Sequence, residues 1–235
     1  MVRELAQAGF SIVRTGEEYQ APFVEIAAPP GLAIYTLCRR VPSLNARFFE
    51  ARDKIAAFNN LNPFFVRHDE GRPHHFRLPT IKIPLDFTRD PVIFPAYQEG
   101  LAAYPQYLLI DIGKCYLALY ERGVLVRVYP ISPGALNHGN RSRTPLVRFT
   151  IQSKAEHKWS SIYDAWMPYS LQVHGPYFIH GGVLPGEPDS KGCIRMFTDH
   201  ARELFNLVEV GTHGRIVRSG PVAPPPGGTH LAGSR

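Results

Sequence analysis

Proline and glycine interrupt this chain often, and the breaks they make set the limits of what can fold together. The 235 residues include 22 prolines and 20 glycines, which favour turns and end helices and strands. The breaks predict a leader over residues 1–30, a small module over 31–90 and a linker over 91–105, followed by a larger domain over 106–219 and a Pro/Gly-rich tail over 220–235. The tail cannot bury a core, so we expect it to be mobile.

Composition narrows the class of protein. With 44% hydrophobic and 20% charged residues, the chain resembles neither a disordered nor a collagen-like protein. No apolar run approaches the ~18 residues of a membrane-spanning helix, so we expect no membrane span. The net charge of +6 favours polyanionic partners such as nucleic acid, anionic lipid or an acidic wall polymer. Because the basic residues are dispersed, we do not predict nucleic-acid binding.

The first 90 residues show signals of both strand and helix. Residues 23–26 predict a strand that ends before a proline pair, and Thr80–Pro84 predict another. Apolar residues over 48–58 recur at the spacing of one helical face. We expect that helix to stop at Asn59-Asn60, because asparagine tolerates the left-handed conformation that ends helices.

The larger domain is predicted to be mainly β with some α, so the whole chain is assigned to the α+β class. One helix is expected around residues 201–208, with Thr198 or Asp199 as its N-cap. Branched and aromatic residues predict strands over 107–112, 116–120, 124–129, 146–152, 172–179 and 214–218.

A cysteine and a histidine form the densest candidate site. His180 lies 13 residues before Cys193, and a loop of that length can fold back and place the imidazole beside the sulfur. Because the thiolate is the nucleophile, such a site must lower a thiol pKa of about 8.5. The Gly181 carbonyl could accept the Nδ1 proton and present Nε2 to sulfur. The N–H groups of Gly192 and Cys193 could form an oxyanion hole. Together these parts predict acyl transfer through a thioester.

Two other interpretations of these residues remain open. His174, His180 and Cys193 are donors that zinc accepts, although no standard zinc motif is present. Cys193 could also be a small buried apolar residue. The other two cysteines, Cys38 and Cys115, could pair in an oxidising compartment or remain buried thiols.

The run from His180 to Arg195 resembles the signature of the L,D-transpeptidase (YkuD) family, His-Gly followed about 13 residues later by Ser/Thr-His-Gly-Cys-Ile/Val-Arg. The likeness covers roughly residues 107–217, including Ser132-Pro133-Gly134 and Thr144-Pro145. It implies a YkuD-type β-sandwich with Cys193 as nucleophile, His180 as base and Gly181 as the group that orients the base. It implies substrate contacts from these residues: Arg195, Lys191, Ser190, Tyr169 and His174. Lys191 stands where the family usually has histidine.

The module over 31–90 resembles LysM, a βααβ unit that binds glycans containing N-acetylglucosamine. The likeness lies in the asparagine-bearing turn after the helix and in the Ile-x-Ile-Pro of the last strand; Gly31-Leu32-Ala33 replaces the usual Gly-Asp-Thr opening. The alternative is an unrelated small α+β unit.

The resemblance implies a peptidoglycan L,D-transpeptidase that needs neither metal nor other cofactor. Its partners would be peptidoglycan stem peptides and an amine acceptor, either another stem or a wall-anchored protein. We expect a periplasmic or wall-associated enzyme whose export signal is absent from this sequence. The alternatives are an L,D-carboxypeptidase or amidase of the same family, or a non-catalytic peptidoglycan-binding protein.

Overall fold

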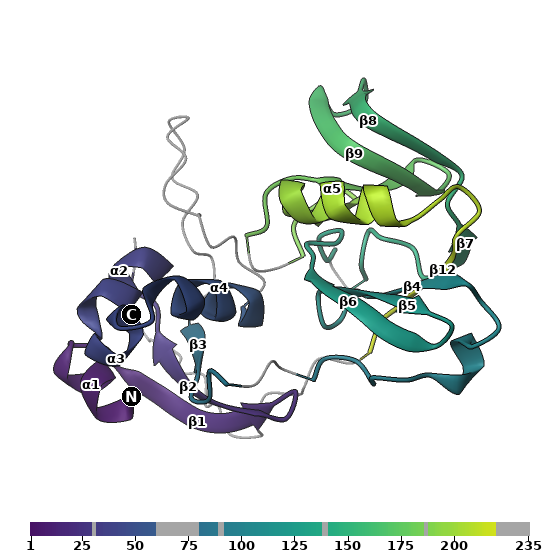
Figure 1. Ribbon diagram of the computed structural model, residues 1–235. Helices are drawn as coiled ribbons and strands as arrows, with labels where there is room; N and C mark the ends of the chain where they lie inside the picture. The colour runs from purple at the N-terminus through teal and green to yellow at the C-terminus, as the bar shows by residue number, and fades with distance from the viewer. Residues whose placement is uncertain (30–31, 60–79, 89–91, 138–140, 186–187, 220–235) are drawn as a thin grey trace.

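The chain folds into two units joined by a short connection, as a computed structural model shows (Figure 1). The structure describes residues 1–29, 32–59, 80–88, 92–137, 141–185 and 188–219. The expected mobile tail, residues 220–235, therefore lies wholly outside the described residues. Within them, no helix is both long and apolar enough to cross a membrane.

The N-terminal unit is built on a three-stranded antiparallel sheet in the order β1-β2-β3. Its central strand, β2, belongs to the expected leader and pairs with both neighbours. The unit contains these elements: α1 (Val2–Gln7), β1 (Ile12–Glu18), β2 (Ala21–Ala27), α2 (Ile34–Arg40), α3 (Pro42–Asn45), α4 (Phe48–Phe58) and β3 (Thr80–Pro84).

The predicted helix over 48–58 and both predicted strands are confirmed. The helix buries Ala51 and Ile55 in an apolar cluster with Val24, Ile26 and Ile81 of the sheet, so the unit is held by helix-on-sheet packing. The helix does end before Asn59, but Asn59 has φ −107° and is not left-handed. Asn60, the other asparagine of that prediction, lies outside the described residues.

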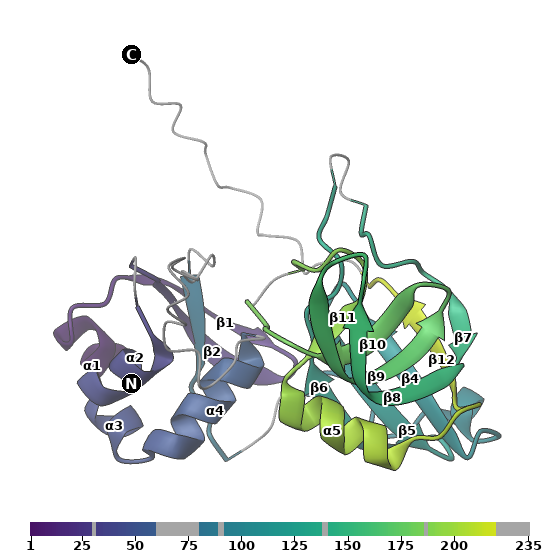
Figure 2. The same ribbon diagram turned by 90° about the horizontal axis from the view of Figure 1, so that it is seen from above.

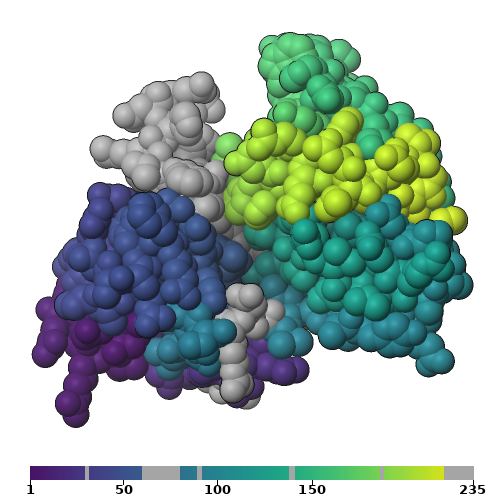
Figure 3. Space-filling view, in the orientation of Figure 1, coloured from purple at the N-terminus to yellow at the C-terminus, as the bar shows by residue number. Residues whose placement is uncertain are grey.

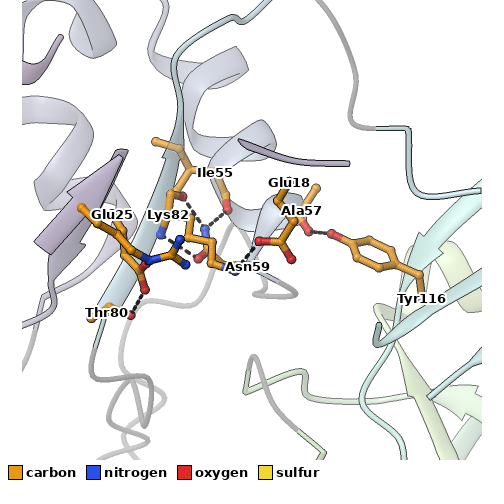
Figure 4. A network of polar contacts seen from close by, with 9 residues as sticks. Glu18, Glu25, Ile55, Ala57, Asn59, Thr80, Lys82 and Tyr116 are labelled. Atoms are coloured by element: carbon orange, nitrogen blue, oxygen red, sulfur yellow. Dashed lines mark hydrogen bonds and ion pairs between the residues drawn. The ribbon is translucent and has the colours of Figure 1, made fainter. Parts of the chain in front are cut away.

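Asn59 instead ties the end of the helix to the sheet (Figure 4). Its Nδ2 group donates to the carbonyls of Ile55 at 2.8 Å and Lys82 at 2.7 Å. Its Oδ1 accepts the Lys82 N–H at 2.9 Å. The amide therefore bridges α4 and β3 through three hydrogen bonds to backbone.

The structure corrects the expected layout of the first 90 residues. The apolar run at 32–37 enters helix α2, and the described part of 31–90 contains three helices and one strand, β3. That strand pairs with β2 of the leader. The boundary placed at residue 30 therefore divides one sheet, and the described part of 31–90 is not a βααβ unit by itself.

The second unit is mainly β, as predicted, with two sheets. A five-stranded sheet has the order β6-β5-β4-β12-β7, and a four-stranded sheet has the order β11-β10-β9-β8. Its elements are η1 (Glu99–Leu101), β4 (Gln106–Asp111), β5 (Tyr116–Glu121), β6 (Val124–Pro130), β7 (Arg148–Thr150), β8 (Ser153–Ser160), β9 (Ala165–His174), β10 (Tyr177–Gly181), β11 (Ile194–Met196), α5 (Thr198–Leu207) and β12 (His213–Val217).

Side chains from both sheets form one core, which includes Leu108, Leu117, Leu171 and Ile194. Helix α5 buries Leu204 against this core and runs beside the β8–β9 hairpin (Figures 1 and 2). In the space-filling view α5 lies at the surface between that hairpin and the teal strands (Figure 3). The core thus fixes β10 and β11, the strands that flank the candidate site.

Two details of the predicted elements are wrong. The N-cap of α5 is Phe197 rather than Thr198 or Asp199, and it makes no side-chain cap bond. The single strand expected over 172–179 is two antiparallel strands, because Gly175 adopts φ +48° and turns the chain between β9 and β10. Glycine adopts that conformation without the clash a Cβ would cause.

The two units contact each other through aromatic side chains. The Tyr116 hydroxyl donates to the Ala57 carbonyl at the end of α4 (Figure 4). The ring of Tyr19 packs edge to face against Tyr116 at 6.0 Å and against Phe58 at 6.3 Å. The two other cysteines lie in separate cores, Cys38 in the N-terminal unit and Cys115 in the second unit. None of the three cysteines, all of which lie in the described part of the chain, forms a disulfide.

Candidate active site

Parallel pairing of β10 and β11 brings the predicted nucleophile and base to one place. His180 is opposite Arg195 in this ladder, and Cys193 directly precedes β11. Both Cys193 and His180 line a cavity of about 230 Å³. Cys193 also lines an adjoining cavity of about 340 Å³ on the side of Tyr177 and Phe178. The thiol therefore stands where two cavities meet.

The His180 ring is held in one tautomer. Its Nδ1 lies 2.8 Å from the Gly181 carbonyl oxygen, which accepts but cannot donate, so Nδ1 carries the proton. This is the contact expected from the sequence. It leaves Nε2 as the nitrogen able to accept a proton.

Burial keeps both partners neutral. Burial lowers the pKa of His180 to about 4, and the positive charge of Arg195 acts in the same direction, against the Gly181 hydrogen bond. Burial also raises the pKa of the Cys193 thiol, opposed by a backbone hydrogen bond at Phe178 and by Arg195. The expectation that the site lowers the thiol pKa is therefore wrong for this state, in which a neutral thiol and a neutral imidazole line the same cavity.

The turn before Cys193 is closed by Ser190. The Ser190 hydroxyl donates to the Cys193 carbonyl and accepts the Gly192 N–H at 3.0 Å. Gly192 has φ +138°, and a Cβ there would lie 2.7 Å from a ring carbon of Tyr177, so only glycine fits. Because its N–H is already bonded, Gly192 is not the free oxyanion donor that was expected. The Cys193 N–H has no acceptor among the described residues.

Arg195 presents one unused donor. Its Nη2 lies 2.7 Å from Asp189 Oδ2 and 3.4 Å from Ser132 Oγ. Its Nε is buried and has no partner in the described part of the chain. Arg195 also lines the 230 Å³ cavity, so its positive charge lies beside that cavity. Lys191 lines both cavities, with its Nζ 5.0 Å from the centre of the Tyr163 ring.

Two expected substrate contacts do not reach these cavities. Tyr169 adopts φ +53° and packs its ring against Phe205 of α5 at 5.9 Å. His174 is exposed at the end of β9 and lines a different hollow with His213. This placement also separates the three residues considered for zinc. No group of three or more His, Cys, Asp or Glu side chains within the described ranges is arranged to hold a metal.

The β8–β9 hairpin contributes cavity residues that the sequence reasoning missed. Tyr163, Trp166 and Met167 line the cavity with His180, and Trp159 lines the other. The rings of Trp159 and Trp166 meet at 5.0 Å, and Trp166 is 64% exposed. The available signal was the position of both tryptophans of the chain seven residues apart in one polar segment.

Comparison with known proteins identifies the family of the second unit. The family model of the YkuD L,D-transpeptidase catalytic domain matches residues 105–222, which include both strands of the site and Cys193. The chain therefore belongs to the YkuD family of L,D-transpeptidase catalytic domains.

Two relatives cover the same region. The chain is 32% identical over 115 residues to YkuD of Bacillus licheniformis, covering 48% of this chain and 66% of that protein. It is 31% identical over 141 residues to YkuD of Bacillus subtilis, covering 53% of this chain and 82% of that protein. The chain thus spans just under two thirds of the first relative. The crystal structure of an L,D-transpeptidase from Stackebrandtia nassauensis aligns with 55% of this chain and 61% of its own, at 19% identity and a TM-score of 0.46.

Proposed function

We propose that this protein is a cysteine-dependent L,D-transpeptidase of peptidoglycan. It cleaves the bond between the third, diamino acid residue of a tetrapeptide stem and the terminal D-alanine. The observation that carries the proposal is the joint lining of one cavity by Cys193, by His180 in a fixed tautomer and by the cationic Arg195.

The first half of the reaction forms a thioester. The Cys193 sulfur attacks the carbonyl carbon of the scissile amide while Nε2 of His180 takes the thiol proton. The carbonyl π electrons move to oxygen, where the Cys193 N–H can donate to the oxyanion. On collapse the C–N bond breaks, and the imidazolium returns its proton to the leaving amine of D-alanine. The acyl group remains on sulfur.

The second half transfers the acyl group. An acceptor amine attacks the thioester carbonyl and gives its proton to His180, and the sulfur leaves and is reprotonated. The product is an amide, either a 3-3 crosslink between stems or an anchored protein. Water in place of the amine gives carboxypeptidase action. This chemistry places the enzyme in the periplasm or at the cell wall and calls on no cofactor.

The neutral resting pair is suited to this sequence of steps. A buried thiolate–imidazolium pair would lose its hydration, and the desolvation free energy of two charges is large in a site of low polarity. In the neutral pair, charge appears only as sulfur attacks, when the oxyanion donor stabilises it. Arg195 supplies a positive charge for a carboxylate of the stem, since it lines the cavity that holds Cys193 and His180.

The test is to mix the protein with a disaccharide tetrapeptide, with and without an amine acceptor, and to measure product and intact-protein masses. We expect release of D-alanine, an acyl adduct on Cys193 and an amide product when the amine is present. Cys193→Ala should give none of these. Cys38→Ala, which removes a thiol buried in the other unit, is the matched control and should behave as wild type.

The outcomes separate the alternatives. Free tetrapeptide shortened by D-alanine, with no amide product at any amine concentration, would assign carboxypeptidase action instead. Binding of the muropeptide without adduct or product would indicate a non-catalytic peptidoglycan-binding protein.

A further inference from the structure

Thr144 lies behind the nucleophile, outside both cavities. Its side chain is buried, with 1% of the residue exposed. Its hydroxyl accepts the Gly134 N–H at 2.7 Å and donates to the Gly192 carbonyl at 2.8 Å. One hydroxyl therefore joins the 132–135 segment to the residue that precedes Cys193.

The hydrogen bond to Gly192 also sets the direction of the Cys193 N–H. The Gly192 carbonyl and the Cys193 N–H belong to one peptide unit, and no cis peptide bond occurs in the described chain. In a planar trans peptide the C=O and N–H vectors point in opposite directions. A donor that holds the carbonyl toward Thr144 therefore turns the N–H of Cys193 away from Thr144.

The surroundings show that this contact is closely built. A Cβ on Gly134 would lie 2.7 Å from the Thr144 nitrogen and 2.9 Å from its hydroxyl oxygen, so only glycine lets the two segments approach this far. Gly192, at φ +138°, has backbone freedom that other residues lack. The orientation of the Gly192–Cys193 peptide must therefore be fixed by a contact from elsewhere in the chain, and the hydrogen bond from Thr144 is such a contact.

We propose that Thr144 is a positioning residue that aims the Cys193 N–H at the oxyanion formed during acyl transfer. The inference rests on the proposed function, because it assigns the source of the oxyanion-hole geometry in that reaction. Thr144 touches neither substrate nor sulfur and acts only through the Gly192–Cys193 peptide.

Other contacts hold the loop without this hydroxyl. Ser190 N–H donates to the Pro133 carbonyl at 3.0 Å, and Ala135 N–H donates to the Ser190 carbonyl at 2.7 Å. Ser132 and Arg195 exchange backbone hydrogen bonds at 2.9 and 3.0 Å. We therefore expect Thr144→Val, which keeps the side-chain shape and removes the hydroxyl, to fold with the loop in place. Thr144→Ser keeps the hydroxyl and is the matched control.

The experiment measures two rates on the same thiol. Acylation by p-nitrophenyl acetate passes through a tetrahedral oxyanion, whereas alkylation by iodoacetamide displaces iodide at carbon and forms none. In Thr144→Val we expect acylation to slow about 10-fold to 100-fold, by analogy with loss of an oxyanion donor. Alkylation should stay within about twofold, and Thr144→Ser should recover most of the acylation rate.

The results that overturn the inference are distinct. Equal slowing of both reactions in Thr144→Val would mean that the hydroxyl only maintains the loop. An unchanged acylation rate would mean that the N–H is aimed by other contacts. A wild-type thiol that is alkylated but not acylated, by this ester or by the muropeptide, would overturn the proposed function and this inference with it.

Discussion

Two side chains with buried polar atoms, Asn59 in the N-terminal unit and Arg195 in the second unit, differ in their hydrogen bonding. In the N-terminal unit, the Asn59 side-chain amide forms hydrogen bonds with three backbone groups: the Ile55 carbonyl, the Lys82 carbonyl and the Lys82 N–H. In the second unit, Arg195 Nε and the Cys193 N–H have no partner among the described residues. Buried polar groups are normally paired. An unsatisfied group beside a cavity therefore indicates where a ligand completes the hydrogen bonding.

This difference divides the effects expected of substitution. Changes at the satisfied groups of the N-terminal unit, which lie away from the two cavities, should lower the free energy of unfolding and leave the chemistry of the folded protein alone. Changes at the unsatisfied groups, and at the residues that carry protons for them, should do the reverse. The predictions below test this division, beginning with the largest effect.

Removing the base should give the largest loss. In His180→Gln we expect D-alanine release from the tetrapeptide to fall about 10²-fold to 10⁴-fold, because no group takes the thiol proton during attack. His174→Gln alters an exposed histidine outside the catalytic cavities and should stay within about twofold of wild type. A comparable loss in both variants would contradict the placement of the base.

The buried imidazole should also make stability depend on pH. Burial lowers the pKa of His180 from 6.5 to about 4, so between these values the unfolded chain binds the proton more strongly. The free energy of unfolding should therefore be constant with respect to this group above pH 6.5 and fall on acidification toward pH 4, by up to about 3 kcal/mol. Burial lowers the pKa of His200 too, which adds a loss of the same sign.

Urea unfolding at several pH values measures this dependence. His180→Gln has no proton to bind and should show a smaller decline between pH 6.5 and 4 than wild type. Equal declines in the two proteins would show that other groups account for the acid sensitivity.

In the N-terminal unit the expected effect is on stability alone. Asn59→Ala removes three hydrogen bonds and leaves the Lys82 backbone groups without their partners, so we expect a loss of about 2 kcal/mol. The turnover number of the remaining folded protein should not change. Asn45→Ala removes an exposed acceptor from Arg39 and should cost less than about 0.5 kcal/mol. A fall in turnover number with Asn59→Ala would show that the units are coupled more closely than the division allows.

Features that depend on residues close together in the sequence could be predicted from the sequence. Cys193 and His180 lie 13 residues apart, and the Gly181 carbonyl is the next group along the chain from the imidazole, so local reasoning found them. The helix over 48–58 followed from its apolar spacing in the same way.

The rest depended on contacts between distant segments. The sheet of the N-terminal unit pairs Ala21–Ala27 with Thr80–Pro84. No local sequence pattern predicts that these two strands pair. Tyr169 faces α5 because its backbone adopts φ +53°, a conformation that residue type does not predict. The occupation of the Gly192 N–H depends on a rotamer of Ser190. Three-dimensional packing decided each of these outcomes.

The smallest predicted effect lies where the two units meet. Tyr116→Phe removes the hydroxyl that donates to the Ala57 carbonyl but keeps the ring that packs against Tyr19, so we expect a loss of about 1 kcal/mol in the free energy of unfolding. Tyr120→Phe is the matched control, because its hydroxyl bonds Gln98 and the Pro95 carbonyl on the side of the second unit.

Unfolding followed separately in each unit distinguishes the two variants. If the Tyr116 hydroxyl joins the units, its loss should shift the transitions of both, as reported by proteolysis or hydrogen exchange, whereas Tyr120→Phe should shift the second unit alone. Acylation of Cys193 should be unchanged in both, since neither tyrosine lines its cavities. Only Tyr116→Phe removes a hydrogen bond between the two units. Slower acylation in Tyr116→Phe, but not in Tyr120→Phe, would therefore mean that this hydrogen bond affects the active site.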